Sequence, residues 1–181
     1  MALGLLFARF VLGMGMAAHG VQKAFGWFGG TGLKGTAGYF EWLGYRPGLI
    51  FAVLAGITEI SSATLILTGF LGPVGPAMVM VVMLVVAGIF VKNGFFAQHK
   101  GYELSAMYMA AALALGFSGY GAYSLDSLLG LTHYYTPAVT WAIMGGGTVV
   151  GLINASLRRP EAPATDAKRT APSGGGGQPA K

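Results

Sequence analysis

Five long apolar runs constrain this chain more than any other feature of its sequence. A helix that crosses about 30 Å of hydrocarbon needs roughly 20 mostly apolar residues. Five segments meet that length: residues 3–25, 49–70, 73–91, 104–122 and 137–157. The pattern of a membrane barrel, about ten alternating residues at a time, is absent from the sequence. The runs therefore predict an all-α integral membrane protein, a four-helix transmembrane bundle plus a fifth transmembrane helix.

Composition agrees with a membrane protein. The chain of 181 residues has a mean hydropathy of +0.63, with 11 Lys and Arg and only 6 Asp and Glu, too few charges to cover a soluble core. Residues 1–157 are the predicted membrane domain. Residues 158–181, rich in Pro, Gly, Ala and small polar residues, are predicted to be a disordered basic tail. The expected partners are membrane lipids, and nucleic acid is not expected, because the basic residues lie between apolar runs and in the tail.

The distribution of basic residues predicts an orientation. Ten of the eleven Lys and Arg residues lie on one side of a five-span topology: Lys23 at the end of the first run and nine others in the first loop, the third loop and the tail. By the positive-inside rule this side is cytoplasmic, so we expect the N-terminus outside and the tail in the cytoplasm. A four-span alternative, with the last run peripheral, would place the basic tail outside. The charge bias disfavours that alternative.

The residues present also limit the cofactors. The chain has no Cys, which excludes disulfides, thiolate nucleophiles and iron–sulfur ligation. Haem held by two histidines is not expected, since His19 is the only histidine within a run, and no clustered ligand set points to a metal. The motif GTGLKG at 30–35 matches a dinucleotide fingerprint, but it follows an apolar run instead of a strand, so no nucleotide is predicted.

Ionisable side chains inside the runs are the strongest indication of a site. Arg9 and His19 lie in the first run and Glu59 lies in the second. An ionised group near the bilayer centre costs roughly 3 kcal/mol, so it normally faces the protein interior with a partner. Antiparallel helices at 1.5 Å per residue place Glu59 within about 7 Å of Arg9 in depth, and about as far from His19. We therefore predict an Arg9–Glu59 ion pair and a cavity shared by all three.

Two interpretations of this cluster remain open. In the first, the Arg9–Glu59 pair only fixes the helix register, and His19 binds a backbone carbonyl. In the second, Arg9, His19 and Glu59 are catalytic residues of a polar pocket that hydrogen-bonds a quinone oxygen or relays protons.

Three more polar residues are assigned to the rim of the predicted pocket: Lys23, Glu103 and Asp126. Lys23 is near the end of the first run, where its side chain can extend to the cytoplasmic border. Glu103 lies on the same side. Asp126 lies on the outer side, at a depth that makes it a second candidate partner for Arg9.

Two other segments leave alternatives open. The first loop, residues 26–47, is rich in aromatic residues, and its segment TAGYFEWLG is interpreted as an interfacial or re-entrant helix or as a lid over the site. In the last run, Gly147 and Gly151 have GxxxG spacing, which suits close helix packing within the bundle or against another subunit.

Several short motifs follow one another along residues 3–126: HGVQKAFG after Arg9, then EWLGYRPG, GITEISSATLILTGF, NGFFAQHKGYE and GYGAYSLD. Their order and spacing resemble the DoxX family of small bacterial and archaeal membrane proteins. The resemblance implies a four-helix core in a prokaryotic cytoplasmic membrane. It also implies kinship with the small subunit of thiosulfate:quinone oxidoreductase, which passes electrons from thiosulfate to a membrane quinone. The family's polar positions are matched by Arg9, His19, Lys23, Glu59, Glu103 and Asp126.

Two functions are consistent with these observations. The first is a membrane subunit of a quinone-linked oxidoreductase that uses thiosulfate or a related sulfur donor, with quinone as substrate or bound electron acceptor. Its electrons come from a directly bound substrate or from a second oxidoreductase subunit, so whether the chain alone is an enzyme stays open. The alternative is an anchor that recruits soluble redox or oxidative-stress proteins without catalysis of its own. A homo-oligomer is left open in both.

Overall fold

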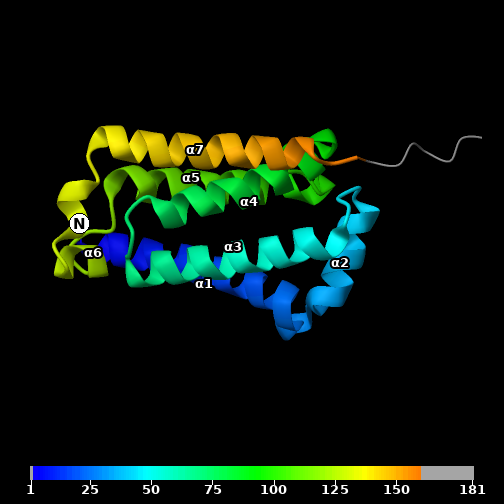
Figure 1. The fold of residues 1–181 in the computed structure, drawn as a ribbon, viewed down its shortest axis with the longest axis horizontal. Coiled ribbons are helices and arrows are strands. Elements are labelled where there is room, and N and C mark those ends of the chain that lie inside the picture. Colours follow the sequence, from blue (N-terminus) through cyan, green and yellow to red (C-terminus); the bar gives the residue numbers. More distant parts are fainter. Residues whose placement is uncertain (1, 160–181) are drawn as a thin grey trace, which may run out of the picture.

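The computed structural model describes residues 2–159, and within that range it contains helices and loops but no strand. Five helices run along the long axis of the molecule (Figure 1). They are α1 (Ala2–Phe25), α3 (Gly48–Thr68), α4 (Val74–Phe90), α5 (Glu103–Ser118) and α7 (Pro137–Ser156). The shorter helices, at the two ends of the bundle, are α2 (Gly32–Trp42), α6 (Leu125–Leu128) and 3₁₀ turns at Trp27–Gly29, Val91–Asn93, Ala97–His99 and Leu131–Tyr134.

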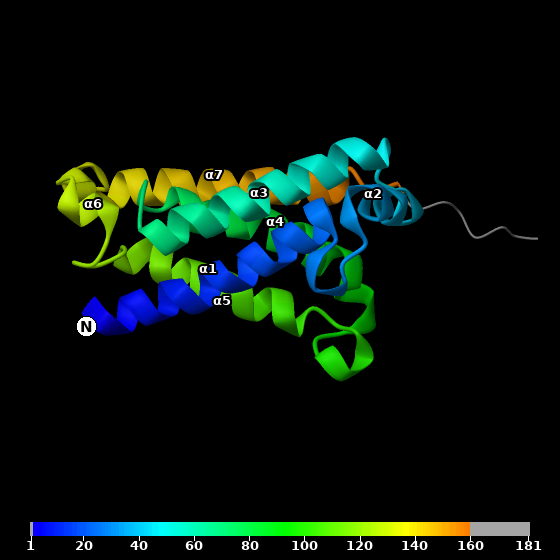
Figure 2. The same ribbon diagram turned by 90° about the horizontal axis from the view of Figure 1, so that it is seen from below.

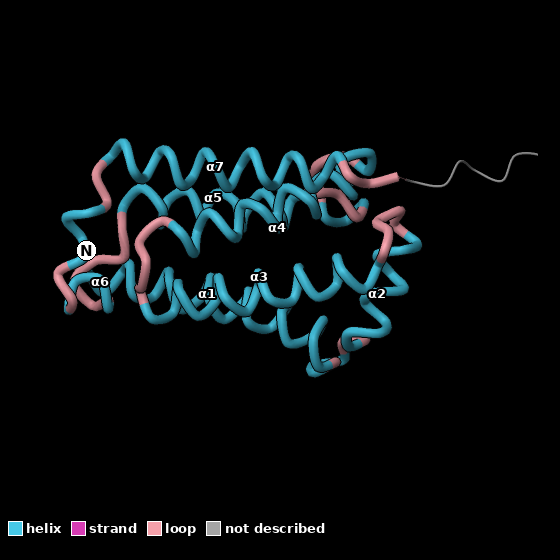
Figure 3. Tube along the Cα trace, in the orientation of Figure 1, coloured by secondary structure: helices cyan, strands magenta, loops and turns pink. Residues whose placement is uncertain are grey.

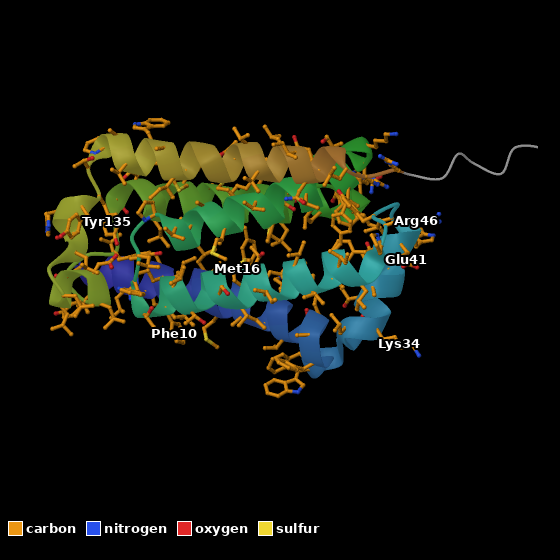
Figure 4. The ribbon with its side chains drawn as sticks, viewed as in Figure 1. Phe10, Met16, Lys34, Glu41, Arg46 and Tyr135 are labelled. Atoms are coloured by element: carbon orange, nitrogen blue, oxygen red, sulfur yellow. The ribbon has the colours of Figure 1, made fainter. Side chains whose placement is uncertain are left out.

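The five long helices form two layers. Figures 1 and 2 show α1 beside α3 in one layer and α4, α5 and α7 in the other, with α3 and α4 in contact between them. Buried apolar side chains from both layers, among them Met16, Ile66, Val79 and Met144, fill the interior. In Figure 4, Met16 points between the layers and Phe10 points away from the bundle. The predicted all-α membrane class is confirmed.

Four helices are long and apolar enough to cross a membrane: α1, α3, α4 with its 3₁₀ extension, and α7. The fourth predicted span, residues 104–122, is longer than the helix that forms there, because α5 has only 16 residues and ends at Ser118. Gly119 follows with a φ of +72°, which stops the helix. At 1.5 Å per residue α5 is about 24 Å long, shorter than the roughly 30 Å of a hydrocarbon core.

Close approach between helices depends on glycines. A Cβ on Gly147 would lie 2.8 Å from the carbonyl oxygen of Ala77, and one on Gly151 would lie 3.0 Å from the Cα of Val81. Both neighbours belong to α4, so the GxxxG motif packs α7 against α4 within the bundle. Of the two alternatives left open by the sequence, packing within the bundle or against another subunit, the glycine pair serves the first.

The two ends of the bundle differ in charge. The chain alternates in direction from one long helix to the next, as the tube in Figure 3 shows. One end, here called the basic end, contains α2; Figure 4 places Lys34 and Arg46 there and Tyr135 at the opposite end, here called the α6 end. The helix predicted around TAGYFEWLG is α2, and it crosses the basic end of the bundle (Figure 1).

The chain after α7 is fixed to the basic end. Arg158 Nε donates to the carbonyl oxygen of Leu43 at 2.8 Å, and the Arg159 amide donates to that of Gly44 at 2.9 Å. Both carbonyls lie in the turn between α2 and α3. The predicted disordered tail therefore does not begin at residue 158, and the rest of it, residues 160–181, lies outside the described residues.

Candidate functional site

Arg9 is held by backbone carbonyls at the α6 end of the bundle. Its guanidinium is 1% exposed and donates from Nε to Ile66 O at 2.9 Å and from Nη2 to Leu67 O at 2.8 Å. These acceptors lie in the last turn of α3, where carbonyls lack an intrahelical donor and a positive charge is favoured. Nη1 donates to Tyr120 O and Tyr123 O, which follow α5. Arg9 thus joins three segments of the chain.

The predicted Arg9–Glu59 ion pair is wrong. The end of α3 offers acceptors within reach of Arg9, and together with the two carbonyls after α5 they occupy each of its three nitrogen atoms. Glu59 lies further along α3 toward the basic end, where Lys23 reaches it instead.

Asp126 is also held by backbone groups. Its carboxylate accepts from the amides of Leu71 at 3.0 Å and Gly72 at 2.6 Å, while its own amide donates to Gly69 O. Burial and the Asp126 carboxylate raise the pKa of Tyr135. Asp126 therefore fixes the turn between α3 and α4, and attracts Arg9 only at longer range. We call Arg9, Gly69 and Asp126 with these hydrogen bonds the Arg9 clamp.

Lys23 and Glu59 form a partly buried ion pair in the half of the bundle toward the basic end. Lys23 Nζ lies 2.6 Å from Glu59 Oε1 and 2.8 Å from Oε2. The Glu59 side chain is 1% exposed, whereas that of Lys23 is 26% exposed. Gly20 permits the contact between α1 and α3, because a Cβ there would lie 2.7 Å from Ile60 Cγ1 and 3.3 Å from Glu59 Cβ. The pair thus lies between a dry interior and a wetter surface.

A cavity of about 500 Å³ lies beside this ion pair. We call it the main cavity. Six helices contribute to its wall, which is mostly apolar, with residues such as Phe51, Val82 and Ile89. Its polar lining residues are His19, Lys23, Thr36, Tyr39, Thr58, Glu59, Ser105, Tyr108 and Asn154. The volume is in the range of about 300–1,000 Å³ that is typical of pockets for small ligands.

His19 and Tyr108 form a second polar feature of the main cavity. Their rings meet edge to face with centroids 6.0 Å apart. The Tyr108 side chain extends over Gly15 of α1, whose missing Cβ leaves room for the hydroxyl. Sequence reasoning missed Tyr108, since a tyrosine in an apolar run resembles packing. The available signal was a phenol hydroxyl in a mostly apolar run, where it needs a polar partner.

The structure brings together only part of the predicted site. Of the three residues predicted to be catalytic, His19 and Glu59 line the main cavity, and Arg9 lies in the clamp at the α6 end. Of the predicted rim residues, only Lys23 lines the cavity. Glu103 accepts a hydrogen bond from the Ala97 amide at 2.8 Å, which stabilises the loop before α5.

Comparison with known proteins gives a family. A family model described as DoxX matches residues 4–93. The chain belongs to the DoxX family. The DoxX match covers α1 to α4, and therefore the Lys23–Glu59 pair and His19, whereas Tyr108 and the α7 wall of the cavity lie beyond it. Comparisons with curated proteins and with solved structures find no match.

Proposed function

We propose that this DoxX protein is the membrane subunit of a quinone-linked oxidoreductase and that its main cavity binds the quinone. The observation that carries the proposal is an apolar cavity in a membrane protein whose polar lining includes a partly buried ion pair, Lys23–Glu59. A cavity that served packing alone would have no need of an ion pair, which is costly to bury.

The residues of the cavity suit the chemistry of a quinone. Its apolar wall accommodates a hydrocarbon tail, and the carbonyl oxygens of its ring need hydrogen-bond donors. Lys23 carries N–H donors, and His19 and Tyr108 add an imidazole and a phenol. Reduction of a quinone to a quinol takes two electrons and two protons, and an ammonium paired with a carboxylate can transfer protons.

The electrons have to come from another molecule. We propose a second subunit or a directly bound substrate as their source, with thiosulfate or a related sulfur compound as the donor that the resemblance implies. The basic end faces the cytoplasm in this proposal, because seven Lys and Arg residues among the described ones belong to segments at that end. The N-terminus then lies on the outer side.

The proposal is tested by purifying the protein gently from native membranes and measuring bound quinone by mass spectrometry. The wild type is compared with Glu59→Gln, and Glu103→Gln is the matched control, because Glu103 does not line the main cavity. We expect near-stoichiometric quinone in the wild type and in Glu103→Gln, and a loss in Glu59→Gln while its folding is retained. Equal quinone content in all three folded proteins would contradict the assignment of the cavity.

A second candidate function is a membrane anchor for soluble redox or oxidative-stress proteins. It is favoured by exposed aromatic side chains of the basic end, including Trp27, Phe28 and Trp42. The same purification distinguishes the two functions. Protein partners retained equally by the wild type and Glu59→Gln, without quinone in either, would favour the anchor.

A further inference from the structure

A second, smaller cavity lies at the basic end, between the last turn of α1 and the start of α2. Its volume is about 330 Å³, and its wall includes Gln22, Thr31 and Thr36. It is thus far larger than the roughly 10–15 Å³ of probe-occupied volume that one water needs. Side-chain amide, hydroxyl and ammonium groups around it provide the two to four polar partners that a buried water typically has.

The two cavities meet at the ion pair. Lys23, Thr36 and Tyr39 line both of them, whereas Glu59 lines only the main cavity. Lys23 is therefore positioned to contact the contents of both spaces. Its partner Glu59 faces the apolar side alone.

A short series of hydroxyl groups connects the surface with this junction. Thr31 is exposed and Thr36 is buried, and their Oγ1 atoms lie 3.4 Å apart. Thr36 Oγ1 donates in turn to the backbone oxygen of Lys23 at 3.4 Å. The hydroxyl groups thus lead from the surface of the basic end to the backbone of Lys23, whose side chain lines both cavities.

We propose that the smaller cavity is a water-filled vestibule that connects the Lys23–Glu59 pair to the aqueous phase at the basic end, whereas the main cavity is closed to that phase. The ion pair then separates an aqueous space from an apolar one. Proton exchange with solution proceeds through the vestibule, and ligand exchange with the bilayer proceeds through the main cavity.

The use of the vestibule rests on the proposed function. Lys23 releases a proton toward a ligand oxygen in the main cavity, so that its N–H bond breaks as the O–H bond of the ligand forms. Water in the vestibule then restores the proton to Lys23. The electrons come from the reducing partner of the proposed function.

Accessibility of single cysteines tests the vestibule directly, because the chain has no native Cys. The variants are Thr36→Cys where the vestibule meets the main cavity, Val82→Cys in the main cavity alone, Thr31→Cys as the control at the exposed edge of the vestibule and Ser62→Cys as the buried control. Each is placed in lipid nanodiscs and treated with a charged methanethiosulfonate reagent or with a lipid-soluble maleimide. Intact mass reports the rate of modification.

We expect the charged reagent to modify Thr36→Cys about tenfold or more faster than Ser62→Cys and Val82→Cys, since thiol reactivity follows exposure to the reagent. The maleimide should modify Val82→Cys. Rapid modification of Thr31→Cys together with a Thr36→Cys rate no higher than that of Ser62→Cys would overturn the vestibule. Equally rapid reaction of Val82→Cys with the charged reagent would overturn the separation of the two spaces.

These outcomes are distinguishable from failure of the proposed function. Labelling does not require a bound quinone, so rapid labelling of Thr36→Cys in a protein without quinone would retain the vestibule and contradict only the quinone assignment. Bound quinone in a protein whose Thr36→Cys variant is not labelled would contradict the vestibule and retain the quinone assignment.

Discussion

The Arg9 clamp and the Lys23–Glu59 pair are two ways of burying charge in one helical bundle. At the α6 end, Arg9 is satisfied by four backbone carbonyls, and its hydrogen bonds tie the end of α3 to the segment after α5. Toward the basic end, Lys23 and Glu59 satisfy each other beside a cavity. A buried charge with backbone partners stabilises a fold, whereas a charge pair that lines a cavity is available to a ligand. The comparison predicts that substitutions in the Arg9 clamp mainly lower the stability of the fold, whereas substitution of both Lys23 and Glu59 mainly lowers ligand binding.

The largest loss of stability is expected from Arg9→Met. The substitution removes four hydrogen bonds from a charged group, and such bonds are strong, so the free energy of unfolding should fall by about 3 kcal/mol or more. Quinone content per folded molecule should stay unchanged. Denaturant unfolding in detergent measures the first quantity and mass spectrometry the second. Loss of quinone with unchanged stability would place Arg9 in the ligand site and remove the contrast.

A double-mutant cycle should separate the two properties at the other region. Lys23→Met alone leaves Glu59 buried without a partner and should cost about 2 kcal/mol, less than a fully buried pair because Lys23 is partly exposed. Lys23→Met combined with Glu59→Met should recover about half of that loss or more, since apolar replacements of buried pairs are well tolerated. Bound quinone should nevertheless fall about tenfold. A double variant that retains the ligand would contradict the role of the pair.

Gly69→Ala tests how closely the clamp is packed. Gly69 has a φ of +67°, and a Cβ there would lie 2.5 Å from Ser124 Cβ and 2.6 Å from Arg9 Nη2. Gly130 is the matched control, because it has the same φ and nothing within 4 Å of an added Cβ. We expect Gly130→Ala to cost about 1 kcal/mol from backbone strain alone and Gly69→Ala to cost about 2 kcal/mol. Equal losses on thermal unfolding would show that Arg9 and Ser124 both adjust freely.

The smallest effect on stability is expected from Gly15→Ala. An added Cβ would displace the Tyr108 hydroxyl and change the wall of the main cavity, while alanine is the better helix former by about 1 kcal/mol. The free energy of unfolding should therefore change little, and quinone affinity should fall about threefold. Gly145→Ala in α7 is the control, since nothing lies within 4 Å of its added Cβ. Quinone titration of both variants measures the difference, and an equal affinity would exclude Tyr108 from the binding surface.

The helices could be predicted from the sequence because apolar runs of that length have few other structures in a membrane. The side that gathers the Lys and Arg residues was likewise predictable. The length of α5 was not predicted, although its last predicted turn contains two glycines, Gly119 and Gly121, and the backbone at Gly119 ends the helix.

The partners of the buried charges were harder to predict. Arg9, Glu59 and Lys23 are visible in the sequence, but the carbonyl acceptors of Arg9 belong to apolar residues such as Ile66 and Leu67 and carry no sequence signal. Counting residues along antiparallel helices placed Glu59 at a depth similar to that of Arg9. Depth alone did not show that Glu59 pairs with Lys23. The main cavity could not be predicted, because its walls come from six helices that are distant in sequence.

The attachment of the segment after α7 has a consequence for the order in which the molecule is made. The last long helix contributes Val150 and Asn154 to the main cavity, and the hydrogen bonds of Arg158 and Arg159 fix its end to the turn between α2 and α3. A ribosome synthesises this helix after the other four long helices of the described residues. During insertion the growing chain therefore has a cavity that lacks one wall, and the cavity is completed only when α7 enters the membrane. Under the proposed function, the complete quinone cavity exists only after α7 has packed against the other helices.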